Sequence, residues 1–149
     1  TDLNIFPKLL QSVKNKDCSI AVGSRLLKSS NVIGRSIKRA FISRCYSFLF
    51  RTMFLVSFKD AQCGFKVVSR DVVDQLLPHV EDTGWFFDTE LLILAEKTNY
   101  LVEEFPVRWV DDPYSSVKII STAWKDIKGL ARMRFGGLGS VKSRLRKSD

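Results

Sequence analysis

The apolar positions of this chain form short runs separated by longer periodic stretches. Residues 19–22 are a brief, mostly apolar run that ends at Gly23, and residues 65–68 are a second run with aromatic and β-branched side chains. Runs of this length and composition predict buried strands. Residues 101–110 have a similar character, but Pro106 interrupts them, which favours an edge strand or a bent strand.

The longer stretches have helical patterns. They cover residues 3–14, 36–56, 71–77, 88–98 and 116–135, whereas the polar residues 24–34 are expected to form a loop. Strands that alternate with helices predict an α/β fold. The glycine-rich residues 136–139 are expected to break the chain, which gives a domain at 1–135 and a basic tail at 136–149.

Charge divides the chain into three parts. Residues 18–59 contain eight Lys or Arg residues and no acid, residues 60–112 contain twelve acids and four bases, and residues 125–149 contain eight bases and two acids. This asymmetry indicates an anionic partner such as a phosphate, an acidic lipid or a nucleic acid, although a solvated charged surface is the alternative. The chain has no helix-turn-helix, zinc-finger or RNP pattern, so no nucleic-acid partner is expected. Three cysteines without Cys-x-x-Cys spacing and a single histidine give no zinc pattern and favour reduced thiols.

The predicted helix at residues 36–56 mixes bulky apolar side chains with Arg44 and Arg51. These charges interrupt it too often for a membrane span, which needs about 20 mostly apolar residues. The composition is typical of an amphipathic basic helix at a bilayer interface. A helix packed in the core is the alternative, and the sequence leaves both interpretations open.

Three basic and polar residues near the first strand can form a phosphate site. Arg25 follows the predicted strand, at the edge where open α/β sheets bind ligands. Arg39 and Ser43 are four residues apart and share one face of the predicted helix. A guanidinium group and a hydroxyl can hold one phosphate together. For Arg39 alone, a solvent-facing helical position is the alternative.

Two further segments place polar groups beside glycine and aromatic side chains, a combination that suits a substrate cleft. Asp60 and Gln62 alternate, so both can face one side, whereas Asp88 and Glu90 follow Trp85 at a predicted helix start. The structural alternatives are a turn capped by Asp60 and a helix capped by Asp88.

These two segments carry a resemblance to a known family. Residues 60–66 (Asp-Ala-Gln-Cys-Gly-Phe-Lys) and 84–92 (Gly-Trp-Phe-Phe-Asp-Thr-Glu-Leu-Leu) resemble the C-terminal half of family 2 glycosyltransferases of the polyprenyl-phosphate type. The dolichyl-phosphate glucosyltransferase branch is more similar than the mannose synthase branch. The resemblance extends from residue 1 to about residue 134. It implies the C-terminal portion of a GT-A fold, which is Rossmann-like.

The family resemblance also concerns a metal. In these enzymes a nucleotide-binding half comes first and ends in an Asp-x-Asp motif that holds a divalent cation on the donor diphosphate. The chain resembles the stretch after that motif. We therefore expect Mg²⁺ or Mn²⁺ with ligands upstream of residue 1, no metal ligand in this chain, and no activity of the chain alone.

The same resemblance implies roles for the candidate residues. It assigns Arg25, Arg39 and Ser43 to the phosphate of the lipid acceptor. It places Asp88 and Glu90 where acceptor and donor sugar meet. A phosphate acceptor is already ionised near neutral pH, so positioning is the expected role of these two carboxylates, and proton removal is not required.

The donor side is expected at Asp60, Gln62 and Trp85, through hydrogen bonds to the sugar or diphosphate and stacking on the sugar. The leading prediction is transfer of a sugar, taken as glucose from the resemblance, from a nucleotide sugar to a polyprenyl phosphate. The protein is expected to lie peripherally on an anionic membrane surface, at the cytoplasmic face. The alternatives are a non-catalytic basic membrane-binding module and an inactive truncated transferase.

Overall fold

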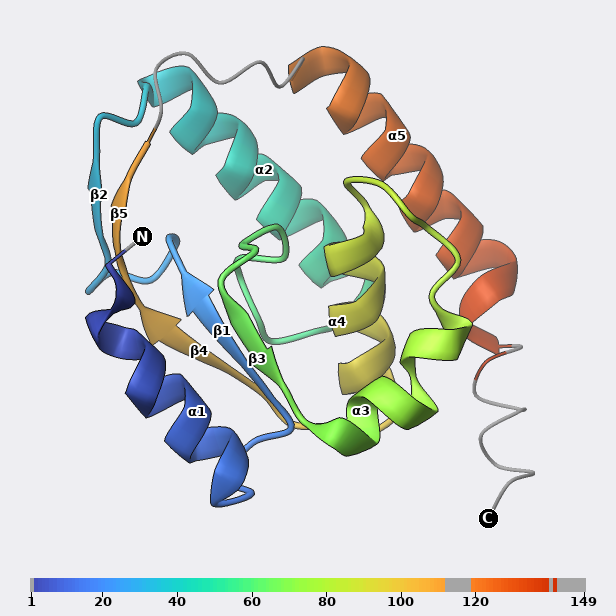
Figure 1. The fold of residues 1–149 in the computed structure, drawn as a ribbon. Helices are drawn as coiled ribbons and strands as arrows, with labels where there is room; N and C mark the ends of the chain where they lie inside the picture. The colour runs from blue at the N-terminus through green and yellow to red at the C-terminus, as the bar shows by residue number, and fades with distance from the viewer. Residues whose placement is uncertain (1, 112–118, 140, 142–149) are drawn as a thin grey trace.

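A three-stranded sheet forms the centre of the computed structural model, which describes residues 2–111, 119–139 and 141 (Figure 1). Its order is β3 (Lys66–Val68), β1 (Ile20–Ser24), β4 (Val102–Pro106). β1 is antiparallel to β3 and parallel to β4. All five residues of β1 are buried, which explains its continuous apolar run in the sequence. The α/β prediction is confirmed.

Helices cover both faces of this sheet. They are η1 (Leu3–Ile5), α1 (Phe6–Lys14), α2 (Ile37–Phe54), α3 (Arg70–Gln75), η2 (Leu77–His79), α4 (Phe87–Lys97) and α5 (Ile119–Arg132). Ala21 packs in a small cluster with Leu9 of α1, whereas its neighbours Ile20 and Val22 face the larger core. Figure 1 shows α1 on one side of the sheet, with α2 and α4 on the other. The period of two along β1 thus divides the core into two layers.

Two short strands form a second sheet that the sequence did not predict completely. β2 (Asn31–Ile33) lies within the predicted loop and pairs in parallel with β5 (Arg108–Val110). β2 has only three residues and is largely exposed, so its sequence has no apolar run. The predicted strand at 101–110 is divided into β4 and β5 at Pro106 and Val107, which confirms the expected interruption.

The last helix corrects the predicted break at residues 136–139. After α5 the chain forms a π-helical turn at Met133–Gly137, and Leu138 and Gly139 are again α-helical. Residues 116–118 of the predicted helix and 142–149 of the predicted tail lie outside the described residues. Glycine disfavours a helix by only about 1 kcal/mol relative to alanine, and packing of buried Met133 can offset that amount.

Helix α2 has an inner and an outer face. Its N-cap is Ser36, whose hydroxyl accepts a hydrogen bond from the Arg39 N–H, and the helix ends at Leu55 in a left-handed conformation. Phe50 is completely buried and stacks on Phe58, with ring centroids 5.1 Å apart. Phe48 points the other way and is 70% exposed. The interpretation of residues 36–56 as a core helix is therefore correct for the inner face of α2. The outer face carries exposed side chains such as Phe48.

Candidate functional site

An ion pair between Arg25 and Asp60 joins the end of β1 to the segment before β3. The carboxylate of Asp60 accepts three hydrogen bonds of 2.8 Å from Arg25, from its backbone N–H, Nε and Nη2. Both side chains are largely buried. The backbone N–H groups of Lys59 and Asp60 donate to the carboxylate of Glu104 on β4, which fixes the segment against the sheet.

The close packing at the end of β1 requires Gly23. A Cβ at this position would lie 2.7 Å from both the Phe65 ring and a methyl group of Val107. Any larger side chain would therefore require the Phe65 and Val107 side chains, or β1 itself, to shift. Gly64, by contrast, has open space around it.

A second group of cations lies at the N-terminus of α2. Arg35 Nη2 donates to Ser43 Oγ at 2.5 Å, and Arg39 Nη1 lies 3.8 Å from Asp111 Oδ2. The Arg35 Nε is buried and has no hydrogen-bond partner among the described residues. Arg35 thus joins the predicted residues Arg39 and Ser43 at this end of α2, and their predicted role in binding a phosphate stays a prediction.

The guanidinium groups of these three arginines influence one another. Burial lowers the pKa of Arg35, and the positive charges of Arg25 and Arg39 lower it further, against the opposing effect of Asp111 and Asp60. Burial would also lower the pKa of Arg25, but its hydrogen bonds and ion pair with Asp60 outweigh this and raise it. Arg25 also lies over the Trp109 ring, 5.2 Å from its centroid. We call Arg25, Arg35, Arg39 and Ser43 the arginine cluster.

Gln62 does not lie in the arginine cluster but bonds to a carboxylate from the last helix. Its Nε2 donates to Asp126 Oδ2 at 2.7 Å. Asp126 is 3% exposed, and its Oδ1 has no partner among the described residues. Burial raises the pKa of Asp126 to about 6, although the Gln62 hydrogen bond opposes this shift. This carboxylate can therefore gain or lose a proton near neutral pH.

Asp88 and Glu90 make separate interactions in the first turn of α4. Asp88 Oδ1 lies 2.5 Å from Lys66 Nζ on β3. Glu90 is buried, and its Oε2 accepts hydrogen bonds from the Asp82 N–H and from Arg132 on α5. Asp88 is not the N-cap of α4, because that position is Phe86. Glu90 joins α4 to α5, and Asp88 joins α4 to the segment that contains Gln62.

Trp85 lies in the loop before α4 and is 62% exposed. Its neighbour Phe86 is buried against α5, where a Cβ on Gly129 would lie 2.4 Å from the Phe86 ring. Phe86 therefore anchors the loop, whereas the Trp85 indole is accessible for stacking. Its predicted contact with a sugar stays a prediction.

The described residues offer no group of three or more His, Cys, Asp or Glu side chains that could hold a metal ion. Within the same residues, no helix is both long and apolar enough to cross a membrane.

Two residues of the site, Arg35 and Asp126, escaped the sequence analysis. Arg35 had a detectable signal, because it immediately precedes the N-cap of α2, where the helix dipole disfavours cations. Asp126 had a weaker one, as an acid between two lysines on a helix with few acids. Its burial depends on packing against distant segments, which no local pattern reveals.

Comparison with known proteins finds relatives along most of the chain, although no protein-family model matches it. The chain is 35% identical over 130 residues to glycosyltransferase AglD of Haloferax volcanii, a match that covers 87% of this chain and 20% of that protein. It is 30% identical over 147 residues to the dolichyl-phosphate β-glucosyltransferase of Dictyostelium discoideum, covering 95% of this chain and 45% of that protein. The Saccharomyces cerevisiae protein of the same name is 32% identical over 132 residues, covering 85% and 38%.

These matches confirm the resemblance seen in residues 60–66 and 84–92. The chain spans less than half the length of each of these three relatives. It is therefore a homologue of part of the polyprenyl-phosphate glycosyltransferases.

Proposed function

We propose that the protein transfers glucose from a nucleotide sugar to a polyprenyl phosphate, and that this chain forms the acceptor side of a GT-A domain. Relatives named dolichyl-phosphate β-glucosyltransferase support the reaction. The observation that carries the proposal for this chain is the arginine cluster, in which three guanidinium groups and a hydroxyl surround the N-terminus of α2.

The electrostatics of α2 favour an anion at this position. The first turn of the helix contains no acid, whereas Arg35 and Arg39 flank its N-cap. Helix N-termini bind phosphate through backbone N–H groups and the helix dipole. Here the positive end of the helix dipole and the cations repel each other. A bound phosphate would reduce this repulsion and would accept a hydrogen bond from the Arg35 Nε, which has no partner among the described residues.

In the proposed reaction an oxygen of the acceptor phosphate attacks the anomeric carbon of glucose. A new carbon–oxygen bond forms, and the bond from that carbon to the nucleoside diphosphate breaks. The acceptor oxygen is already ionised near neutral pH, so the protein has to position it and shield its charge. Asp60 fixes the Nε and Nη2 of Arg25, and Arg25 Nη1 makes no hydrogen bond among the described residues, which leaves it for a phosphate oxygen.

On the donor side, we propose that Gln62, Trp85 and Asp88 position the sugar. Asp88 is joined through Lys66 to the segment of Gln62, which brings the two predicted donor regions together. Asp60 and Glu90 act through their ion pairs with Arg25 and Arg132. We propose that the donor diphosphate binds together with Mg²⁺ or Mn²⁺, as the family resemblance implies.

We further propose that α2 lies on an anionic membrane surface, peripherally and at the cytoplasmic face. Its outer face carries large exposed apolar side chains: Ile37, Phe41, Phe48 and Leu55. Arg44 and Arg51 alternate with them along the same stripe of the helix. Bulky apolar and basic side chains on one helix face are typical of interfacial binding. The three free cysteines are consistent with a reducing compartment.

Because this chain alone is expected to be inactive, the test is an assay of the purified full-length protein with nucleotide sugars, a polyprenyl phosphate, and Mg²⁺ or Mn²⁺. We expect glucose transfer, and we expect Arg35→Gln to lower kcat/KM for the lipid phosphate by about ten- to a hundredfold, since charge-assisted hydrogen bonds contribute about 1.5–3 kcal/mol. KM for the nucleotide sugar should change little. Arg70→Gln, which removes an exposed charge on α3, is the matched control.

Absence of transfer with every donor, together with retained binding to vesicles, would favour a non-catalytic membrane-binding module. Equal effects of Arg35→Gln and Arg70→Gln on an active enzyme would remove the arginine cluster from the acceptor site.

A further inference from the structure

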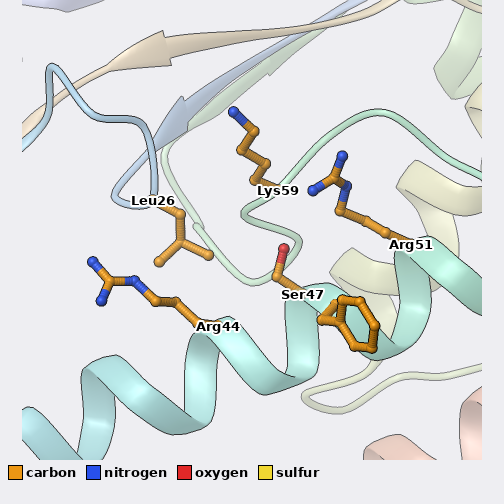
Figure 2. Close-up of a pocket in the computed structure, with 6 residues that line it drawn as sticks. Leu26, Arg44, Ser47, Arg51 and Lys59 are labelled. Atoms are coloured by element: carbon orange, nitrogen blue, oxygen red, sulfur yellow. The ribbon is translucent and has the colours of Figure 1, made fainter.

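A basic pocket lies between α2 and the two segments that contain Leu26 and Lys59 (Figure 2). Its volume is about 220 Å³, and its lining comprises Leu26, Arg44, Ser47, Phe48, Arg51 and Lys59. Figure 2 shows three cationic side chains in this lining, Arg44 and Arg51 from the helix and Lys59 from the segment after it, with the Ser47 hydroxyl between the two arginines. We call these four residues and the space that they line the outer pocket.

The positive charge of the outer pocket is not neutralised by the described part of the protein. No acid lines it, and neither Arg44, Arg51 nor Lys59 forms an ion pair among the described residues. The Nε of Arg51 is buried and has no hydrogen-bond partner there. Buried polar atoms are rarely left unpaired, so this nitrogen is available to donate a hydrogen bond to a ligand or to water.

The outer pocket is distinct from the arginine cluster, although the two are neighbours. Leu26 follows Arg25 and Lys59 precedes Asp60 in the sequence, so the two sites adjoin at the Arg25–Asp60 ion pair. No side chain belongs to both. The carboxylate of Asp60 is used by Arg25 and does not neutralise Lys59.

We propose that the outer pocket is a second phosphate-binding site. Two guanidinium groups, an ammonium group and a hydroxyl can surround the oxygens of one phosphate monoester or diester. The exposed Phe48 ring on the rim adds an apolar contact that suits a phosphate carried by a lipid. The shared chemistry is the phosphate group, which either a phospholipid headgroup or free phosphate provides.

The first experiment titrates the purified protein with inorganic phosphate at constant ionic strength and follows the backbone amide NMR signals of Ser47 and Lys59. Arg44→Gln combined with Arg51→Gln should weaken this binding by about tenfold or more, because each charge-assisted hydrogen bond contributes about 1.5–3 kcal/mol and 1.4 kcal/mol corresponds to tenfold. Arg70→Gln combined with Lys14→Gln, which removes two exposed charges from α3 and α1, should leave it unchanged.

The second experiment identifies the source of the phosphate. Binding to phosphatidylcholine vesicles is compared with and without phosphatidylglycerol, for the same two double variants. Loss of both phosphate binding and phosphatidylglycerol-dependent binding assigns the outer pocket to a lipid headgroup. Loss of phosphate binding alone assigns it to a free phosphate. Both results support the proposal.

Unchanged phosphate binding in Arg44→Gln/Arg51→Gln, within about twofold, would overturn it. Lys59→Gln gives an independent readout if that double variant does not fold. Arg35→Gln should shift only the amide response near Ser36 and Arg39. A result against the outer pocket is thereby distinguishable from a result against the proposed acceptor site, which the sugar-transfer assay tests separately.

Discussion

The two positively charged regions along α2 differ in how their charges are compensated. In the arginine cluster, Arg25 pairs with Asp60, Arg39 lies 3.8 Å from Asp111 and Arg35 bonds to Ser43, so each arginine has a protein partner. In the outer pocket, Arg44, Arg51 and Lys59 have no such partners among the described residues. Paired arginines are preorganised for one ligand geometry, whereas unpaired cations create a positive potential that attracts anions from solution. The first region suits a reacting phosphate and the second suits a docked one.

The largest expected effect comes from breaking the Arg25–Asp60 pair. Asp60→Asn removes the countercharge of a largely buried arginine, and loss of one partner of such a pair destabilises proteins by about 3–5 kcal/mol. Lys59→Gln, one residue away, removes an unpaired charge and should change stability by about 0.5 kcal/mol or less. Chemical denaturation followed by circular dichroism measures both. Similar losses of stability in the two variants would show that the Arg25–Asp60 ion pair does not make the arginine cluster different from the outer pocket.

The two faces of α2 provide the next comparison. Phe50→Ala should destabilise the fold by about 3–5 kcal/mol, because Phe50 is fully buried against Phe58. Phe48→Ala should leave stability within about 0.5 kcal/mol but weaken binding to anionic vesicles. The sequence left open whether the bulky apolar side chains of residues 36–56, Phe48 and Phe50 among them, contact lipid or the core. Undiminished vesicle binding by folded Phe48→Ala would remove the outer face from the membrane proposal.

An intermediate effect is expected at Asp126. Like the cations of the outer pocket, this carboxylate has no partner of opposite charge among the described residues. Its pKa is about 6 in the folded state against 3.8 for the unperturbed group, so the folded state binds this proton more tightly than the unfolded chain. Its contribution to stability therefore falls as the pH rises from about 4 to about 6 and is lowest above pH 6.

Asp126→Asn removes this charge while it keeps the shape of the side chain. At pH 7 the variant should be more stable than the parent by at most about 3 kcal/mol, at about 1.4 kcal/mol per pKa unit. The difference should shrink toward pH 4, where Asp126 is protonated. Thermal unfolding at both pH values measures it. A destabilised variant at pH 7 would mean that the carboxylate has a cationic partner.

The smallest effect concerns salt. Binding of the protein to anionic vesicles should weaken between about 0.1 M and about 1 M NaCl, since the screening length falls from about 10 Å to about 3 Å. Arg44→Gln/Arg51→Gln should flatten this dependence, because each basic residue near an anionic surface contributes about 1 kcal/mol. A salt dependence equal to that of the parent protein would assign the electrostatic attraction to other cations.

Local sequence determined the helices and the central strand. The start of α2 near Ser36, the apolar run of β1 and the interruption at Pro106 were predicted within a few residues of their observed positions. These features depend on neighbours close in the chain, so their pattern is visible in a single sequence. The resemblance carried by residues 60–66 and 84–92 likewise needed no structure, and the comparisons confirm it.

Only the tertiary structure decided which side chains meet. β2 exists because β5 pairs with it, and the exposed residues of β2 have no strand pattern of their own. Gln62 and Asp126 are 64 residues apart and meet when α5 packs on the core. Ser43 bonds to Arg35, a residue that the sequence analysis did not select, because that contact depends on how the chain enters α2. Helical periodicity places Phe48 and Phe50 on different faces, but the fold alone determines which face is covered.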